Sequence, residues 1–215
     1  HAFLLTALSW ISVAIFGSLP FIFSDLNLSI TDSFFESMSG ITTTGSTIIT
    51  DLNSTPKAIL LWRAILQWLG GIGIIVMAIT LMPLMNVGGM QLLKISSTDG
   101  SEKILPKTKE ISIRLIIIYI ALTFLCALFY KIFGMKFFDS LTHSMTTIAT
   151  GGFSNYNDSI GHFNNFKIEM TSMVFIILGS IPFIAYIKYL SGTKNIFITD
   201  TQIKSFIKII FFSIL

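Results

Sequence analysis

Long apolar runs alternate with short polar segments along the chain. The runs without charged residues are 2–23, 64–93, 115–130 and 170–187, the third being extended by apolar residues before Arg114. A helix that crosses a bilayer needs roughly 20 apolar residues. The pattern therefore predicts four membrane-spanning helices and an all-α integral membrane fold.

Composition agrees with a lipid environment. The 215 residues are 53% hydrophobic and only 12% charged, with a mean hydropathy of +0.79, whereas a soluble domain carries about 25% charged residues. Residues 2–23 have no basic start and run too long for a cleaved signal peptide, so we expect a span there. Because residues 205–215 look like the beginning of a helix, we interpret the chain as an internal piece of a longer protein.

Basic and acidic residues separate along the chain. Nine of the fourteen basic residues follow the second and fourth runs: Lys94, Lys103, Lys107, Lys109, Arg114, Lys188, Lys194, Lys204 and Lys208. Seven of the eleven acids lie around 24–57 and 131–167: Asp25, Asp32, Glu36, Asp51, Asp139, Asp158 and Glu169. Lys and Arg favour cytoplasmic loops, so the first set is expected inside and the second outside. The net charge of +3 then reflects topology and indicates no nucleic-acid partner.

Two parts of the chain align with each other when Asp32 is placed on Asp139. This displacement, which we call the repeat spacing, places DSFFESMSGITTTGST (32–47) on DSLTHSMTTIATGGFS (139–154), with seven identities in sixteen positions. The same spacing places 3–24 on 110–131 and 63–83 on 170–190. The repeated unit is predicted to be a long helix, a short amphipathic segment, a Thr-Gly stretch and a second long helix.

The middle segment of each unit is expected to begin and end on the external side of the membrane, because the basic, cytoplasmic linkers lie before the first long helix and after the second. Residues 30–43 would form a helix of only ~20 Å, too short to cross but long enough to dip inward and return as extended chain. Non-helical backbone at membrane depth is tolerated only when it is buried in protein or lines a watery path. The Thr-Gly stretches are therefore predicted to be pore loops.

The chemistry of these segments favours a cation. A short helix entering from outside directs its partly negative C-terminal end inward, and Asp32 and Asp139 fall in the first turns, with Ser29 or Thr31 as a candidate cap. Successive carbonyl oxygens can replace the hydration shell of potassium, and glycine reaches a positive φ without a Cβ penalty. The candidate ion-binding residues are Thr43, Thr44, Gly45, Ser46, Thr150, Gly151, Gly152 and Phe153.

Several motifs give the chain a family resemblance. They are GSLPFIFSD (17–25), SGITTTGST (39–47), LWRAILQWLGGIGIIVMAI (61–79), LMPLMNVGGMQL (81–92) and HSMTTIATGGFS (143–154). On these residues the chain resembles the TrkH/TrkG branch of the Trk/Ktr/HKT superfamily of potassium transporters. The resemblance implies tandem parallel helix–pore-loop–helix repeats, four in one protein, arranged as in a potassium-channel pore domain.

The resemblance also implies a domain plan. Residues 1–85 and 110–191 would be the first two repeats, 86–109 a cytoplasmic linker, and 192–215 a second linker with the start of a truncated third repeat. Potassium would be the transported ion, with no organic cofactor in this chain. The implied partners are membrane lipid, the remaining repeats of the same protein, a second copy in a homodimer and a cytoplasmic nucleotide-binding TrkA-like subunit. The implied location is the bacterial cytoplasmic (inner) membrane, with the pore loops on the external side.

The candidate filter departs from the T-V-G-Y-G strand of potassium channels. Ser46 and Phe153 stand at the Tyr position, and no second glycine follows, so we expect a shorter filter and looser selectivity. In the related plant branch a serine in place of the first glycine accompanies sodium transport. Gly45 therefore favours potassium.

Two classes of function remain open. The first is potassium uptake through the carbonyl filter, with passive conduction and proton or sodium symport undecided. The second is a secondary transporter of another cation or small solute that binds at broken helices in mid-membrane. The repeat is parallel, whereas inverted repeats are common in that class, and no acidic residue lies in mid-span to relay protons. With no nucleophile–base pair, metal cluster or phosphate loop, we expect no enzyme.

Other candidate residues have structural explanations. Arg63, near the start of a span, is expected to reach the external interface as an anchor, the alternative being a gate. His143 aligns with Glu36 and is expected to make a buried hydrogen bond, the alternative being ion sensing. Gly70 and its neighbours suit helix packing. The polar segment 94–110 is either a solvated loop or part of a docking surface.

Overall fold

The computed structural model describes residues 2–85 and 104–214, and every regular element in these ranges is helical. In chain order they are α1 (Ala2–Ile22), α2 (Ile30–Ile41), α3 (Lys57–Met85), α5 (Ile104–Ile132), α6 (Phe137–Ile148), the 3-10 helix η2 (Ser159–Phe163), α7 (Phe166–Ser180), α8 (Phe183–Leu190), α9 (Ile196–Thr199) and α10 (Thr201–Ile214). The all-α prediction is confirmed for these ranges. Residues 86–103, most of the expected linker, lie outside them.

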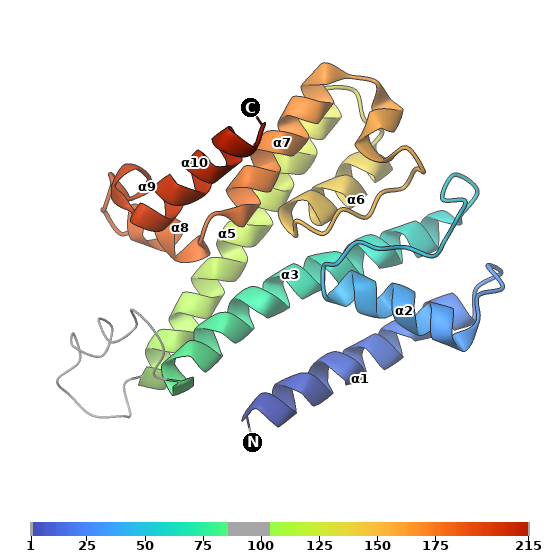
Figure 1. Cartoon of the computed structure of the whole chain (residues 1–215), viewed down its shortest axis with the longest axis horizontal. Coiled ribbons are helices and arrows are strands. Elements are labelled where there is room, and N and C mark those ends of the chain that lie inside the picture. Colours follow the sequence, from blue (N-terminus) through green and yellow to red (C-terminus); the bar gives the residue numbers. More distant parts are fainter. Residues whose placement is uncertain (1, 86–103, 215) are drawn as a thin grey trace.

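The helices form two neighbouring groups. In each group a short helix packs against two longer ones: α2 against α1 and α3, and α6 against α5 and α7. Figure 1 shows the first group in blue to green and the second in yellow-green to orange. The groups meet where α6 packs against α3, so α6 contacts helices of both groups.

Two described helices are long and apolar enough to cross a membrane, Lys57–Ile75 within α3 and Glu110–Ile132 within α5. Within α1, the apolar helix Ala7–Ile22 is shorter than these two candidate spans. Large apolar side chains point outward, including Phe16 and Phe124, which are each 70% exposed. An exposed apolar surface of this extent suits contact with lipid.

The single helix expected over 170–187 is wrong. α7 ends at Ser180 and α8 begins at Phe183, with a bend of 82° between them. Pro182 explains the break, because proline lacks an N–H and disfavours helical geometry in the residue before it. Ile181 is accordingly extended, with φ −68° and ψ 136°. The pair counts as a third candidate span only if both helices are taken together.

The repeat spacing holds for the short helices but not for the helices that follow them. The first and last residues of α2, Ile30 and Ile41, correspond to Phe137 and Ile148, the first and last residues of α6. By contrast, α7 begins two residues later than the repeat spacing from the start of α3 would place it. The expected pairing of 63–83 with 170–190 is therefore wrong by two residues, because the loop before α7 contains η2 and is longer.

Glycine packing supports the corrected pairing. A Cβ on Gly70 of α3 would collide with the carbonyl oxygen of Ile41, the last residue of α2. A Cβ on Gly179 of α7 would likewise press on the carbonyl oxygen of Ile148, the last residue of α6. Gly70 and Gly179 occupy the same position when the starts of α3 and α7 are aligned. The expected packing role of Gly70 is confirmed, since only glycine lets α3 approach the end of α2 this closely.

Candidate ion-binding site

The end of α2 is closed by two backbone hydrogen bonds. The amide of Thr43 donates to the carbonyl of Gly40 at 3.0 Å, and the amide of Thr44 donates to the carbonyl of Ser39 at 3.0 Å. This pair of bonds is the Schellman motif, which satisfies the last carbonyls of a helix. The chain leaves the helix in an extended form immediately after it.

The end of α6 is closed in the same way. The amide of Thr150 donates to the carbonyl of Thr147, and the amide of Gly151 to the carbonyl of Thr146, each at 3.0 Å. The repeat spacing places these two donors on Thr43 and Thr44. The two Thr-Gly stretches, which we define as 43–46 and 150–153, therefore start from equivalent helix ends.

Both stretches have two positive φ angles at equivalent positions. Thr43 and Thr150 have φ of 55° and 52°, and Gly45 and Gly152 both have φ of 83°. Glycine adopts such angles without a Cβ penalty. For a β-branched threonine the left-handed region is strained, at a cost of order 1–3 kcal/mol, and such strain persists where the surroundings enforce it.

The two stretches touch each other. A Cβ on Gly45 would collide with the carbonyl oxygen of Gly151. A Cβ on Gly151 would collide with the side-chain amide of Gln67, which comes from α3. Gly152, by contrast, faces open space. The close approach therefore requires glycine at positions 45 and 151. At position 152 the positive φ favours glycine.

The first residues of the two stretches line one cavity. It has a volume of about 450 Å³ and includes Thr43 and Thr150 in its wall, together with Tyr119, Ser180 and Pro182. No charged side chain of the described residues lines it. The α7–α8 break therefore lies beside the first residues of the two stretches.

The remaining candidate residues differ in exposure. Thr44, Ser46 and Gly152 are exposed, whereas Gly151 and Phe153 are buried. The ring of Phe153 lies 4.1 Å from the guanidinium carbon of Arg63. The aromatic residue at the Tyr position thus packs into the protein.

A buried ion pair lies behind the stretches, and the expectation that Arg63 reaches the interface is wrong. Arg63 is 1% exposed, and its Nε donates to Oε1 of the fully buried Glu36 at 2.7 Å. Glu36 also accepts from the Thr47 hydroxyl at 2.9 and 3.0 Å and from the Ile48 amide at 3.1 Å. The carboxylate on α2 therefore fixes the chain that follows the first stretch.

His143 replaces Glu36 in the second unit, and its expected buried hydrogen bond is confirmed. Nδ1 lies 2.9 Å from the carbonyl oxygen of Asp139, and Nε2 lies 3.1 Å from Oγ of Ser154. Because a carbonyl only accepts, Nδ1 carries the hydrogen, and a neutral ring accepts from the Ser154 hydroxyl at Nε2. The repeat spacing places Ser154 on Thr47, so α6 fixes the second stretch as α2 fixes the first.

The acids of the first helical turns have different surroundings. Ser29 caps α2, accepting from the Asp32 amide at 3.1 Å, which confirms one of the two candidate caps. Asp139 is buried and accepts from Asn155 Nδ2 at 2.9 Å and from the Tyr156 hydroxyl at 3.1 Å. Asp139 therefore orders the loop after the second stretch.

Sequence reasoning missed Gln67 and Asn155. The Gln67 Oε1 accepts from the Phe153 amide at 3.1 Å, so a side chain of α3 holds the second stretch directly. Asn155 binds both Asp139 and Thr142. An amide residue in an otherwise apolar run was the available sequence signal for Gln67. The sequence around Asn155 gave no such signal.

Apolar helices long enough to span a bilayer, with braced non-helical Thr-Gly stretches between the helices, are the features of an integral membrane protein. The family model for TrkH, a cation transport protein, matches residues 1–212. The chain belongs to the TrkH family, which confirms the resemblance and assigns it to transport proteins rather than enzymes.

Curated relatives agree with this assignment. The chain is 40% identical over 214 residues to the Trk system potassium uptake protein TrkI of Halomonas elongata, covering 99% of this chain and 44% of the relative. It is 41% identical over 215 residues to the Trk system potassium uptake protein TrkH of Escherichia coli, covering 98% and 44%. The chain therefore spans less than half the length of these relatives.

A solved structure has the same fold. The crystal structure of the potassium transporter TrkH from Vibrio parahaemolyticus superimposes with a TM-score of 0.84 at 37% sequence identity. The superposition covers 95% of this chain and 42% of that one. The helical arrangement described above is thus that of a TrkH protein over the matched part.

Proposed function

We propose that this chain contributes to potassium uptake by a Trk system and binds the ion at the two Thr-Gly stretches. The observation that carries the proposal is the equivalence of the stretches: they share helix ends and φ angles, touch each other, and line a common cavity. Relatives described as Trk system potassium uptake proteins support potassium as the ion.

Backbone carbonyls and threonine hydroxyls would supply the ligands. The C-terminal ends of α2 and α6 lead into the stretches, and a helix C-terminus carries a partial negative charge that favours a cation. The buried carboxylate of Glu36 is paired with Arg63, and that of Asp139 accepts from Asn155 and Tyr156. A filter without a free charge binds weakly enough for the ion to leave, as conduction requires. Ser46 and Phe153 at the Tyr position support looser selectivity than in potassium channels.

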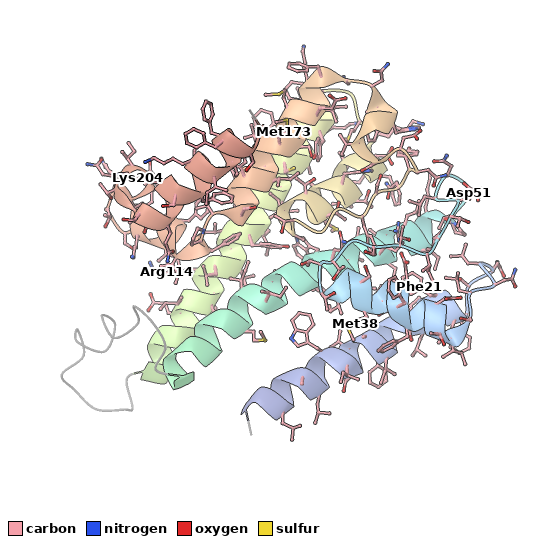
Figure 2. All side chains as sticks on the ribbon, in the orientation of Figure 1. Phe21, Met38, Asp51, Arg114, Met173 and Lys204 are labelled. Atoms are coloured by element: carbon pink, nitrogen blue, oxygen red, sulfur yellow. The ribbon has the colours of Figure 1, made fainter. Side chains whose placement is uncertain are left out.

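The charge distribution supports an orientation. Figure 2 shows Arg114 and Lys204 toward the left side of the view and Asp51 on the right. Because basic residues favour the cytoplasmic side, the stretches would enter from the external side of the bacterial cytoplasmic membrane. Residues 1–85 and 110–191 would be two parallel repeats, with 86–109 as a cytoplasmic linker and 192–215 as a second cytoplasmic linker and the start of a third repeat.

The family resemblance suggests the partners in the same proposal. Further repeats of the same protein would complete the filter around one axis, and the protein would form a homodimer in lipid. A cytoplasmic nucleotide-binding subunit of the TrkA kind would regulate it.

One observation favours a second candidate function. Broken helices beside a mid-membrane cavity are typical of secondary transporters, and the α7–α8 break at Pro182 lines the cavity. The candidate is a transporter of another cation or a small solute with its site in this cavity. No charged side chain of the described residues lines the cavity to pair with a charged solute, which weighs against it.

The test is ion uptake by the full-length protein in cells without other potassium uptake. Gly45→Ser and Gly152→Ser each place a side chain at a φ of 83°, and we expect both to lower the ratio of potassium to sodium influx. Gly134→Ser is the matched control, because Gly134 also has a positive φ, with open space around it, but lies between α5 and α6. An unchanged ratio in both filter variants would place the ion path elsewhere.

A further inference from the structure

We propose that Arg63 is a positioning residue for ion selectivity, which sets the second Thr-Gly stretch against the first. The inference rests on the proposed function, since it assigns a role to a residue behind the proposed filter. Arg63 is buried, and it acts through the backbone that it holds.

Arg63 contacts two separate segments with different parts of one guanidinium group. Nε donates to Glu36 of α2 at 2.7 Å, and Nη1 donates to the carbonyl oxygen of Ser154 at 2.9 Å. The guanidinium carbon lies over the Phe153 ring, 4.1 Å from its centroid. A planar fork with several fixed donors can make these contacts together, whereas the single ammonium of lysine cannot.

Glu36 extends the connection to the first stretch. Its oxygens accept from Thr47 and Ile48, immediately after residues 43–46. A continuous path of contacts therefore runs from the chain after the first stretch through Glu36 and Arg63 to the second stretch. Among the residues that the structure describes, the other ion pair is Arg114–Glu110, which is exposed.

Gln67, one turn after Arg63, adds a second attachment from the same helix. Its Oε1 accepts from the Phe153 amide at 3.1 Å, and its amide packs against Gly151. α3 of the first unit thus holds the second stretch at Gly151 and Phe153, and the chain immediately after it at Ser154. The two stretches are in atomic contact, so a shift of one changes its register with the other.

The attachment is not repeated in the second unit. When the start of α3 is aligned with the start of α7, the counterparts of Arg63 and Gln67 are Ser172 and Ile176. Neither has a cation or an amide. The set of carbonyls that faces an ion therefore depends on Arg63 for the relative placement of the two stretches.

A purely structural role for Arg63 predicts something different. Burying Glu36 without a partner is costly, so Arg63→Gln can fail to fold through charge imbalance alone. The double variant Glu36→Gln/Arg63→Gln removes both charges and avoids that imbalance. Arg63→Lys keeps the charge and loses the fork. If Arg63 only compensates Glu36, Arg63→Lys keeps the native selectivity, because both the charge and the contacts of Glu36 to Thr47 and Ile48 remain.

The experiment measures potassium and sodium uptake by the full-length protein, normalised to folded protein in the membrane by detergent gel filtration. For Arg63→Lys and the double variant we expect the potassium-to-sodium ratio to fall by roughly tenfold, within the 10²-fold that misplacement by about 1 Å can cost a positioned site. Arg114→Gln, which removes the arginine of the exposed pair, is the control and should keep the native ratio.

The outcomes separate the two proposals when Gly45→Ser and Gly152→Ser are measured alongside. A native ratio in Arg63→Lys and in the double variant, with an altered ratio in the glycine variants, overturns the role of Arg63 and leaves the filter intact. Native ratios in all four variants overturn the proposed filter itself. A lowered ratio in all four supports both.

Discussion

Gly45 and Gly152 have the same φ of 83° but different surroundings, so replacing each with alanine isolates the contact between the two stretches. The methyl group of Gly152→Ala would meet open space. The methyl group of Gly45→Ala would collide with the carbonyl oxygen of Gly151. Both variants carry the same backbone strain, and one carries a clash as well.

The expected losses of stability follow from the backbone strain and from the clash. A left-handed conformation costs an L-residue about 1–2 kcal/mol, which is the expected loss of stability for Gly152→Ala. Overpacking in a well-packed region adds typically ~1–3 kcal/mol. Gly45→Ala should therefore lose about 1–3 kcal/mol more than Gly152→Ala, because a backbone carbonyl cannot rotate away as a flexible side chain can.

The assay is thermal unfolding of the purified full-length protein in detergent, followed by loss of the monodisperse gel-filtration peak. Gly134→Ala, at a φ of 109° with no atom within 4 Å of the new methyl group, should behave like Gly152→Ala. The reasoning is refuted if Gly45→Ala is as stable as Gly152→Ala, because the two stretches then do not touch at Gly45.

Three further changes test the bracing of the site by the same unfolding assay. Glu36→Gln leaves the buried Arg63 without its anion and should cost about 3–5 kcal/mol, whereas removing the exposed charge in Arg114→Gln should cost less than about 1 kcal/mol; equal losses would contradict the buried pair. Ser29→Ala removes the cap of α2 and should cost about 1 kcal/mol; no loss would contradict the cap. Tyr156→Phe removes the hydrogen bond to Asp139 and should cost about 1.5–3 kcal/mol. Burial and the Asp139 carboxylate raise the pKa of Tyr156, so the phenol stays protonated and this loss should not change between about pH 6 and 9; a loss that shrinks in that range would contradict the assignment.

Features with a local chemical cause could be predicted from the sequence. The bounds of α2 and α6 follow from a cap or an acidic first turn at one end and a Thr-Gly sequence at the other. Their repetition along the chain predicted the shared conformation of Gly45 and Gly152. Hydrophobicity does not indicate the break at Pro182, because the apolar run continues through it on both sides; the proline itself is the sequence signal for a kink or a helix end there.

Features that depend on distant partners could not be predicted. Arg63 near the start of an apolar run resembles an interfacial anchor, and only the three-dimensional fold brings Glu36 of α2 and Ser154 of the second unit to it. The amide of Gln67 likewise finds its partner at Phe153, far along the chain. Burial of a charge is decided by such partners, and no local pattern indicates them.

The central claim is that residues 43–46 and 150–153 bind the transported ion together. The most direct measurement is anomalous scattering from crystals of the full-length protein soaked in Rb⁺ or Tl⁺, both of which substitute for potassium. The account predicts anomalous density within coordination distance of backbone oxygens from both stretches, on the side of Thr43 and Thr150 that faces the cavity. Density confined to the cavity near Pro182, or contacts to only one stretch, would contradict it.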